Sequence, residues 1–213
     1  MTDYSVHEPL DGSAAIATVS SRVGTAGCFV TVGSDKPCIL SSAHVLAAIP
    51  SDKTVFQPPG ADGSRAVAKL WDFYGPDPAH KDNVLDAAIA VLCDTKYDPR
   101  IGALAPPRGF NPNVVANQRV WIHGAGSGRR RSGRIQVVGE PKTVIYDDGS
   151  SAGFQGLVRC ECYSQAGDSG AAVLDAAGYV VGVHLCGTED YSWFCRISMV
   201  LARWPKIQLI TSN

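Results

Sequence analysis

Residues 165–170 read Gln165-Ala166-Gly167-Asp168-Ser169-Gly170 and hold a serine inside a glycine-rich turn. Glycine permits backbone conformations that larger residues avoid, so the Ser169 hydroxyl can stand on a sharp turn. A serine hydroxyl becomes a good nucleophile when a base takes its proton and a carboxylate orients that base. The stretch therefore directs the search to a histidine and an aspartate elsewhere in the chain.

Two upstream segments supply these partners. The first, Ser-Ala-His-Val at 42–45, contains His44, whose imidazole suits a general base that later acts as an acid. The alternative role for His44 is a core histidine bonded to a backbone carbonyl. Asp86 begins an apolar strand, where a carboxylate is costly unless it has a buried partner such as an imidazole N–H. Asp82 is the competing aspartate, but it lies in a polar run and we expect it to face water.

The chain order His44, Asp86, Ser169 and the three local contexts resemble the chymotrypsin-like serine proteases, and in particular non-secreted bacterial trypsin-like peptidases and glutamyl endopeptidases. The resemblance covers about residues 14–204. It implies a serine endopeptidase that cleaves proteins or peptides through an acyl-enzyme intermediate, with no metal or other cofactor. The competing hypothesis is a binding module on the same fold, catalytically silent until a partner docks.

The same resemblance assigns further roles around the nucleophile. The N–H groups of Gly167 and Ser169 are expected to form the oxyanion hole, and Asp168 is expected to hold that loop in shape. Secreted relatives pair this aspartate with a new amino terminus beginning Ile-Val-Gly-Gly, a segment that is not present near the start of this sequence. We therefore expect the loop to form without processing, or to be ordered by an activating partner or the substrate.

A specificity pocket is predicted from two positions near the nucleophile. Tyr163 stands six residues before Ser169, where relatives that cut after Lys or Arg carry an acid, so trypsin-like specificity is not expected. The segment 182–187, Gly-Val-His-Leu-Cys-Gly, resembles the Gly-Ile-His-Trp-Gly of glutamyl endopeptidases and the Gly-x-His of picornaviral main proteases. His184 would donate a hydrogen bond to Glu or Gln, with Gly187 beside it. The alternative is a histidine that merely packs under Tyr163.

Short apolar runs separated by turn signals predict an antiparallel all-β fold. The runs are 14–19, 28–32, 38–40, 66–70, 87–92, 120–123, 134–138, 156–162, 171–174, 179–185 and 193–197. Residues 33–37 and 175–178 are expected hairpin tips. Residues 105–113 contain three prolines, which break regular pairing and divide the chain almost in half.

The resemblance turns this pattern into two six-stranded barrels and a short C-terminal helix. We expect residues 1–107 to form the barrel that carries His44 and Asp86, and residues 108–213 to form the barrel that carries Ser169. The helix is predicted over 197–204, with Ser198 as its N-cap and Pro205 closing it.

Composition limits the compartment and the partners. The net charge of −1 gives no global attraction to nucleic acid or to anionic membranes, so we expect neither partner. The sequence shows no signal-peptide run and no apolar run of about twenty residues, so a cytoplasmic location is expected. The seven cysteines are an odd number, which favours free thiols over a closed set of disulfides, and Val45 stands where secreted relatives have a cysteine.

Two other motifs suggest functions that we do not favour. Cys160-x-Cys162 and His184-x-Cys186 have zinc-like spacing, but alternate residues of a strand point to opposite faces, so buried free thiols are expected instead. Residues 124–134 combine glycines with four arginines, a charge pattern suited to steering an acidic substrate or nucleic acid. We expect a flexible, solvated hairpin there, too rich in glycine for a strand or a helix.

Overall fold

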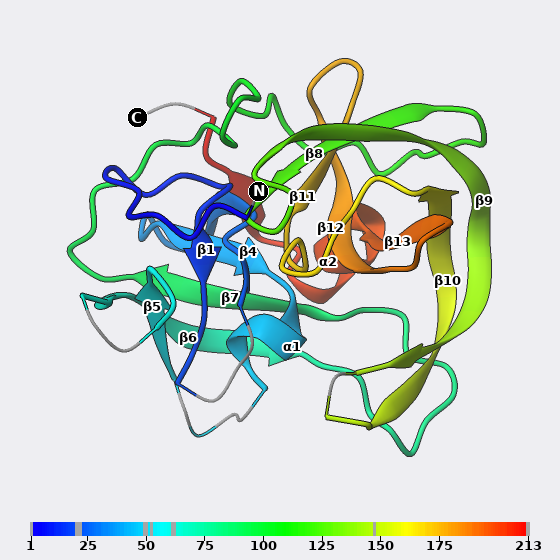
Figure 1. The fold of residues 1–213 in the computed structure, drawn as a ribbon, viewed down its shortest axis with the longest axis horizontal. Helices are drawn as coiled ribbons and strands as arrows, with labels where there is room; N and C mark the ends of the chain where they lie inside the picture. Colours follow the sequence, from blue (N-terminus) through cyan, green and yellow to red (C-terminus); the bar gives the residue numbers. More distant parts are fainter. Residues whose placement is uncertain are drawn as a thin grey trace.

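The computed structural model describes residues 2–19, 23–48, 51, 53–60, 63–146 and 148–211. Two six-stranded antiparallel assemblies lie side by side, built largely from the two halves of the chain (Figure 1). The all-β prediction is confirmed.

The first assembly is a sheet with the strand order β14-β3-β4-β7-β6-β5. Its strands are β3 (Cys28–Val32), β4 (Cys38–Ser41), β5 (Thr54–Gln57), β6 (Arg65–Tyr74), β7 (Ala87–Leu92) and β14 (Ile207–Leu209). A two-stranded ribbon of β1 (Ala15–Ile16) and β2 (Gly24–Thr25) accompanies it, and the short helix α1 (Ala43–Leu46) follows β4.

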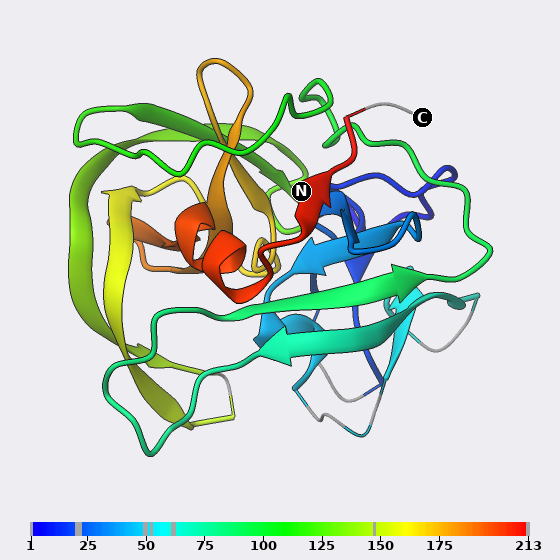
Figure 2. The ribbon, with the colours of Figure 1, turned by 180° about the vertical axis from the view of Figure 1, so that it is seen from behind.

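The second assembly is a closed barrel with the order β10-β13-β12-β11-β8-β9. Its strands are β8 (Arg119–Gly124), β9 (Arg129–Ile145), β10 (Ser151–Glu161), β11 (Ala172–Asp175), β12 (Val180–Gly187) and β13 (Tyr191–Arg196). The helix α2 (Ile197–Arg203) follows β13, and β14 then returns to pair with β3 of the first sheet (Figure 2). The division between residues 107 and 108 stays a prediction.

The start of the C-terminal helix corrects one expectation. The N-cap residue of α2 is Arg196, in an extended conformation and with no side-chain cap, so Ser198 lies inside the helix. The helix ends at Arg203, before Pro205, as expected from the missing N–H and the ring of proline.

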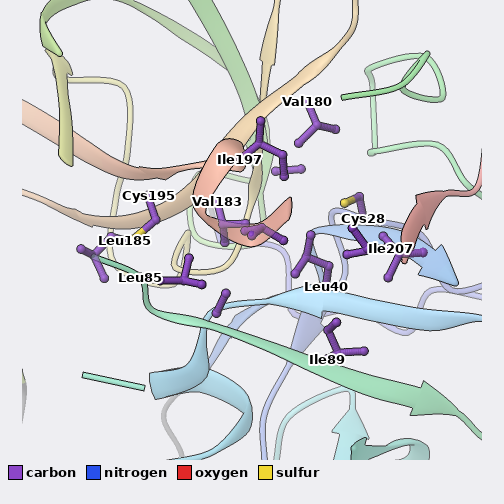
Figure 3. Packing of buried hydrophobic residues seen from close by; sticks show 14 of the residues in the cluster. Cys28, Leu40, Leu85, Ile89, Val180, Val183, Leu185, Cys195, Ile197 and Ile207 are labelled. Atoms are coloured by element: carbon purple, nitrogen blue, oxygen red, sulfur yellow. The ribbon is translucent and has the colours of Figure 1, made fainter. Parts of the chain in front are cut away.

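One apolar cluster joins the two assemblies and supports the region between them (Figure 3). Cys28 and Leu40 of the first sheet share it with Val183 of the barrel and Ile197 of α2, and all four are at most 1% exposed. Such a continuous core fixes the two halves relative to each other, because close-packed side chains resist displacement. Segments carried by different halves can therefore hold a precise relative geometry. Within the described residues, no helix is both long enough and apolar enough to cross a membrane.

Candidate active site

His44 and Asp86 form a polar contact between α1 and the residue that precedes β7. His44 lies in α1 directly after β4, and Asp86 lies one residue before β7, the strand that pairs with β4. The His44 Nδ1 atom is 2.7 Å from Asp86 Oδ2, and the backbone N–H of His44 donates to Asp86 Oδ1 at 3.0 Å. The carboxylate thus fixes both the position of the residue and the direction of its ring.

The Asp86 side chain is fully buried, whereas the His44 side chain is 24% exposed. Burial alone would raise the pKa of Asp86, but the charge of His44 and hydrogen bonds from His44 and the Ala43 backbone hold this pKa below its usual value. Asp86 is therefore an ionised partner for an imidazolium. Asp82 is exposed to solvent, as we expected of the competing aspartate.

Ser169 stands on a turn between Gly167 and Gly170, whose φ angles are +94° and +89°. Both angles lie in the left-handed region, which glycine adopts without the steric cost of a Cβ atom. The Ser169 hydroxyl donates to the carbonyl of Leu185 at 3.3 Å. A Cβ on Gly170 would collide with Ser41 of β4, so the turn lies directly against the segment that leads into His44.

Strand β2 clamps this turn from the first half of the chain. The Thr25 N–H donates to the Ser169 carbonyl at 2.8 Å, and the Thr25 hydroxyl donates to the Gly167 carbonyl at 2.9 Å. In the described part of the chain, neither Gly167 nor Ser169 uses its own N–H in a hydrogen bond to a protein acceptor. These two donors are available for a ligand oxygen.

The Asp168 carboxylate holds the turn in shape through two hydrogen bonds to backbone N–H groups. Its Oδ1 accepts the N–H of Ser127, and its Oδ2 accepts the N–H of Gln165, each at 2.8 Å. Burial raises the pKa of the Asp168 carboxyl, while the hydrogen bonds from Ser127 and Gln165 oppose that rise. These local contacts shape the loop within this chain.

The segment 124–134 differs from the flexible hairpin expected there. Gly124 ends β8, residues 125–128 turn, and Arg129 begins β9, so most of the segment belongs to strands. Residues 124–127 are buried. The packing here is so close that a Cβ on Gly124 would strike the Asp168 carboxylate and one on Gly126 would strike the Ala166 carbonyl. The glycines allow close approach of two backbones, a reason that composition alone did not reveal.

The predicted pocket residues are close together but deeply buried. Tyr163 is 0% exposed and His184 is 1% exposed, with the Tyr163 hydroxyl 3.3 Å from His184 Nδ1 and the rings edge to face at 5.4 Å. Burial lowers the pKa of His184 to about 3. Its imidazole is therefore neutral at physiological pH. Gly187 lies at the exposed end of β12, where a Cβ would collide with the Ser164 hydroxyl.

Tyr146 was missed by the sequence analysis. Its hydroxyl donates to Asp86 Oδ2 at 3.2 Å, and its ring lies 5.5 Å from the ring of His44. It comes from the second barrel, 60 residues after Asp86. A local sequence motif gives no signal for such a contact.

All seven cysteines are free thiols in the structure, and Cys28, Cys38, Cys160 and Cys195 are buried. Within the described ranges, no group of three or more His, Cys, Asp or Glu side chains has the arrangement of a metal site.

Comparisons with known proteins identify the family and the fold. Residues 24–183 match the family model described as a trypsin-like peptidase domain. No curated protein matches the chain. Three solved structures cover 94–97% of this chain and are themselves covered completely. They are a glutamic acid specific serine protease that uses a histidine triad in substrate binding (TM-score 0.70, 20% identity), Nocardiopsis protease (0.70, 18%) and Thermobifida fusca protease A (0.67, 20%). At these identities the structural likeness concerns the fold alone.

Proposed function

Because this chain belongs to the trypsin-like peptidase domain family, we propose that it is a serine endopeptidase with Ser169 as nucleophile, His44 as general base and Asp86 as the residue that orients the base. The observation that carries the proposal is the 2.7 Å contact between His44 Nδ1 and the buried Asp86 carboxylate. This contact leaves Nε2 as the nitrogen that serves the nucleophile, which is the arrangement that acyl transfer requires.

The reaction follows from these roles. Ser169 Oγ attacks the carbonyl carbon of the scissile peptide bond while its proton passes to His44 Nε2. The developing oxyanion accepts hydrogen bonds from the N–H groups of Gly167 and Ser169. The C–N bond then breaks as the proton on His44 passes to the leaving amine, and the acyl group stays on Ser169 as an ester. Water attacks the acyl carbon while its proton passes to His44, and that proton then passes to Ser169 Oγ as the ester bond breaks, which releases the acid and the free serine. Since Asp168 already shapes the loop, we propose that no activating partner is needed.

For the residue before the cleaved bond we propose glutamine or glutamate, with glutamine favoured. His184 lies next to the nucleophile turn, because the Gly170 N–H donates to its carbonyl at 3.0 Å. When Nδ1 accepts a hydrogen bond from the Tyr163 hydroxyl, the ring hydrogen is on Nε2, and Nε2 is a neutral donor. A neutral donor pairs with an amide oxygen across the physiological pH range but does not compensate a carboxylate charge. The similar structure of a glutamic acid specific protease that uses histidines is in keeping with a histidine in this role.

The test uses fluorophosphonate labelling and matched peptides that differ only in the residue before the bond. Wild-type protein should label and cleave, whereas Ser169→Ala should do neither while keeping the wild-type circular dichroism spectrum. Cleavage after glutamine should exceed cleavage after lysine by about tenfold or more, since a buried donor left unpaired costs about 1–3 kcal/mol. Labelling of Ser169→Ala at the wild-type rate would refute the assignment of Ser169 as the nucleophile.

The free thiols fit a reducing compartment such as the cytoplasm, so activity should persist in dithiothreitol.

A further inference from the structure

The long hairpin of β9 and β10 reaches from the second barrel to the segment that carries Asp86. Asn83, three residues before Asp86, donates from its side chain to the Gly153 carbonyl at 2.9 Å. Its backbone donates to the same carbonyl at 3.1 Å and accepts the Gln155 N–H at 2.7 Å. Both ribbon views show the end of this hairpin beside the loop that precedes β7 (Figures 1 and 2). The hairpin is therefore fixed relative to Asp86.

Tyr146 occupies the first position after β9, where the hairpin turns. Its N–H donates to the Ser150 carbonyl at 2.8 Å, and its carbonyl accepts the Gly149 N–H at 3.0 Å, so the turn determines its backbone position. From there its hydroxyl contacts Asp86 Oδ2 at 3.2 Å, the same oxygen that contacts His44 Nδ1. Burial and the charge of Asp86 raise the pKa of Tyr146, so the hydroxyl remains a donor.

We propose that Tyr146 is a positioning residue of this active site: its hydroxyl fixes the Asp86 carboxylate and moderates the negative charge that the carboxylate presents to His44. The inference rests on the proposed function, in which His44 is the base. A carboxylate that accepts an additional hydrogen bond shares its charge with the donor and stabilises an imidazolium less strongly. Removing the hydroxyl should therefore loosen Asp86 and make His44 easier to protonate.

Other titratable groups face this pair, and burial keeps them neutral. From β12, His184 faces His44 and Cys186 faces Asp86; from β13, Cys195 faces Asp86. Burial lowers the pKa of His184 to about 3, raises that of Cys186 to about 12 and raises that of Cys195 further. These groups do not titrate between pH 5 and 9. A change in that range on altering Tyr146 therefore reports on the pair itself.

The experiment compares wild type with Tyr146→Phe, which keeps the ring and removes only the hydroxyl. We expect kcat to fall by about threefold to tenfold with KM within twofold. The acid limb of kcat/KM, which reports protonation of the free base, should move up by about half a pH unit. A direct NMR titration of the His44 imidazole should show the same upward shift. In an Asp86→Asn background, Tyr146→Phe should leave the His44 titration unchanged, since the coupled charge is gone.

Tyr179→Phe is the matched control, because Tyr179 is 37% exposed and lies directly before β12. It should alter neither kcat nor the His44 titration. Unchanged kcat and an unchanged His44 titration in Tyr146→Phe would overturn the role of Tyr146. If the wild-type protein neither labels nor cleaves, the proposed function fails, and the NMR titration alone then decides whether Tyr146 moderates the charge of Asp86.

Discussion

At the scale of single residues, a polar side chain that is buried with one hydrogen-bond partner has a large effect on the stability of the folded state. His184 is the clearest case, because its imidazole is 1% exposed and its Nδ1 contacts the Tyr163 hydroxyl. A protonated histidine in such a place lacks the hydration that would stabilise its charge, which is why the pKa of His184 falls to about 3. The residue that we propose to recognise the substrate side chain therefore also makes the folded state sensitive to acid.

This gives a prediction for stability against pH. The pKa of His184 is lowered in the folded state, so the unfolded chain binds the extra proton first, below its pKa of about 6.5. The free energy of unfolding should be fully retained above pH 6.5 and decrease as the pH falls, with His184 alone removing about 2 kcal/mol between pH 7 and pH 5. His123, whose pKa burial also lowers, acts in the same direction, whereas His7, whose pKa its bond to Asp11 raises, opposes it.

Urea unfolding at pH 7 and pH 5 checks this on wild type and His184→Gln. Glutamine does not titrate, so the difference between the two pH values should be smaller in the variant by about 2 kcal/mol, whatever the variant does to absolute stability. The opposing contribution of His7 cancels in this comparison. An equal pH dependence in both proteins would mean that His184 is solvated or already charged.

At the scale of elements, the turn between β8 and β9 is as important to the site as the nucleophile turn. Gly126 packs so closely that a Cβ there would strike the Ala166 carbonyl, next to the turn that carries Gly167 and Ser169. Neighbouring Ser127 donates its N–H to Asp168. The shape of the proposed oxyanion hole therefore depends on a segment that contributes no catalytic side chain.

We predict that Gly126→Ala lowers kcat/KM by up to about 100-fold, because displacing one oxyanion donor costs about 3 kcal/mol. Steady-state kinetics on the glutamine peptide measure this, with the fluorophosphonate rate as a second readout. Gly75→Ala is the control, since a Cβ there would make ordinary contacts at 3.5–3.7 Å with Phe73 and Ala43. Activity of Gly126→Ala within twofold of wild type would contradict the role of this turn.

The elements also show what the sequence was able to predict. The apolar runs 28–32 and 87–92 coincide with β3 and β7, because buried β-branched and small residues mark a central strand. Strands β2, β5 and β14 were missed: β2 has two residues, β5 begins and ends with polar residues, and β14 has three. The partner of β14 is β3, and the paired residues are 175 to 179 positions apart in sequence, so local periodicity holds no information about such pairing.

At the scale of the whole molecule, the site is assembled from both halves of the chain. His44 and Asp86 come from the first half, and the nucleophile turn and Tyr146 from the second. The three motifs could be recognised in the sequence because each of them consists of a few consecutive residues. The Tyr146 contact could not, since it depends on the length of β9 and on where the hairpin of β9 and β10 meets the segment before β7. The triad itself stays a prediction until its chemistry is measured.

The cluster between the two halves should make the molecule unfold as one unit. Ile197 is fully buried in that cluster at the start of α2, close to β12 and β13. We predict that Ile197→Ala lowers the free energy of unfolding by about 2–5 kcal/mol, the usual range for removing a large buried aliphatic side chain. Loss of catalytic activity and loss of secondary structure should follow the same transition in urea, because both halves share this core.

Ser198→Ala, the next position along the same helix, is the matched control. A serine that caps a helix is worth about 0.5–2 kcal/mol, but Ser198 lies inside α2 and the N-cap is Arg196. Its replacement should therefore change stability by less than about 0.5 kcal/mol, since alanine is the better residue in a helix interior. Two separate urea transitions, one for activity and one for secondary structure, would show that the halves unfold independently. In that case the cluster would not be what holds the two halves of the site together.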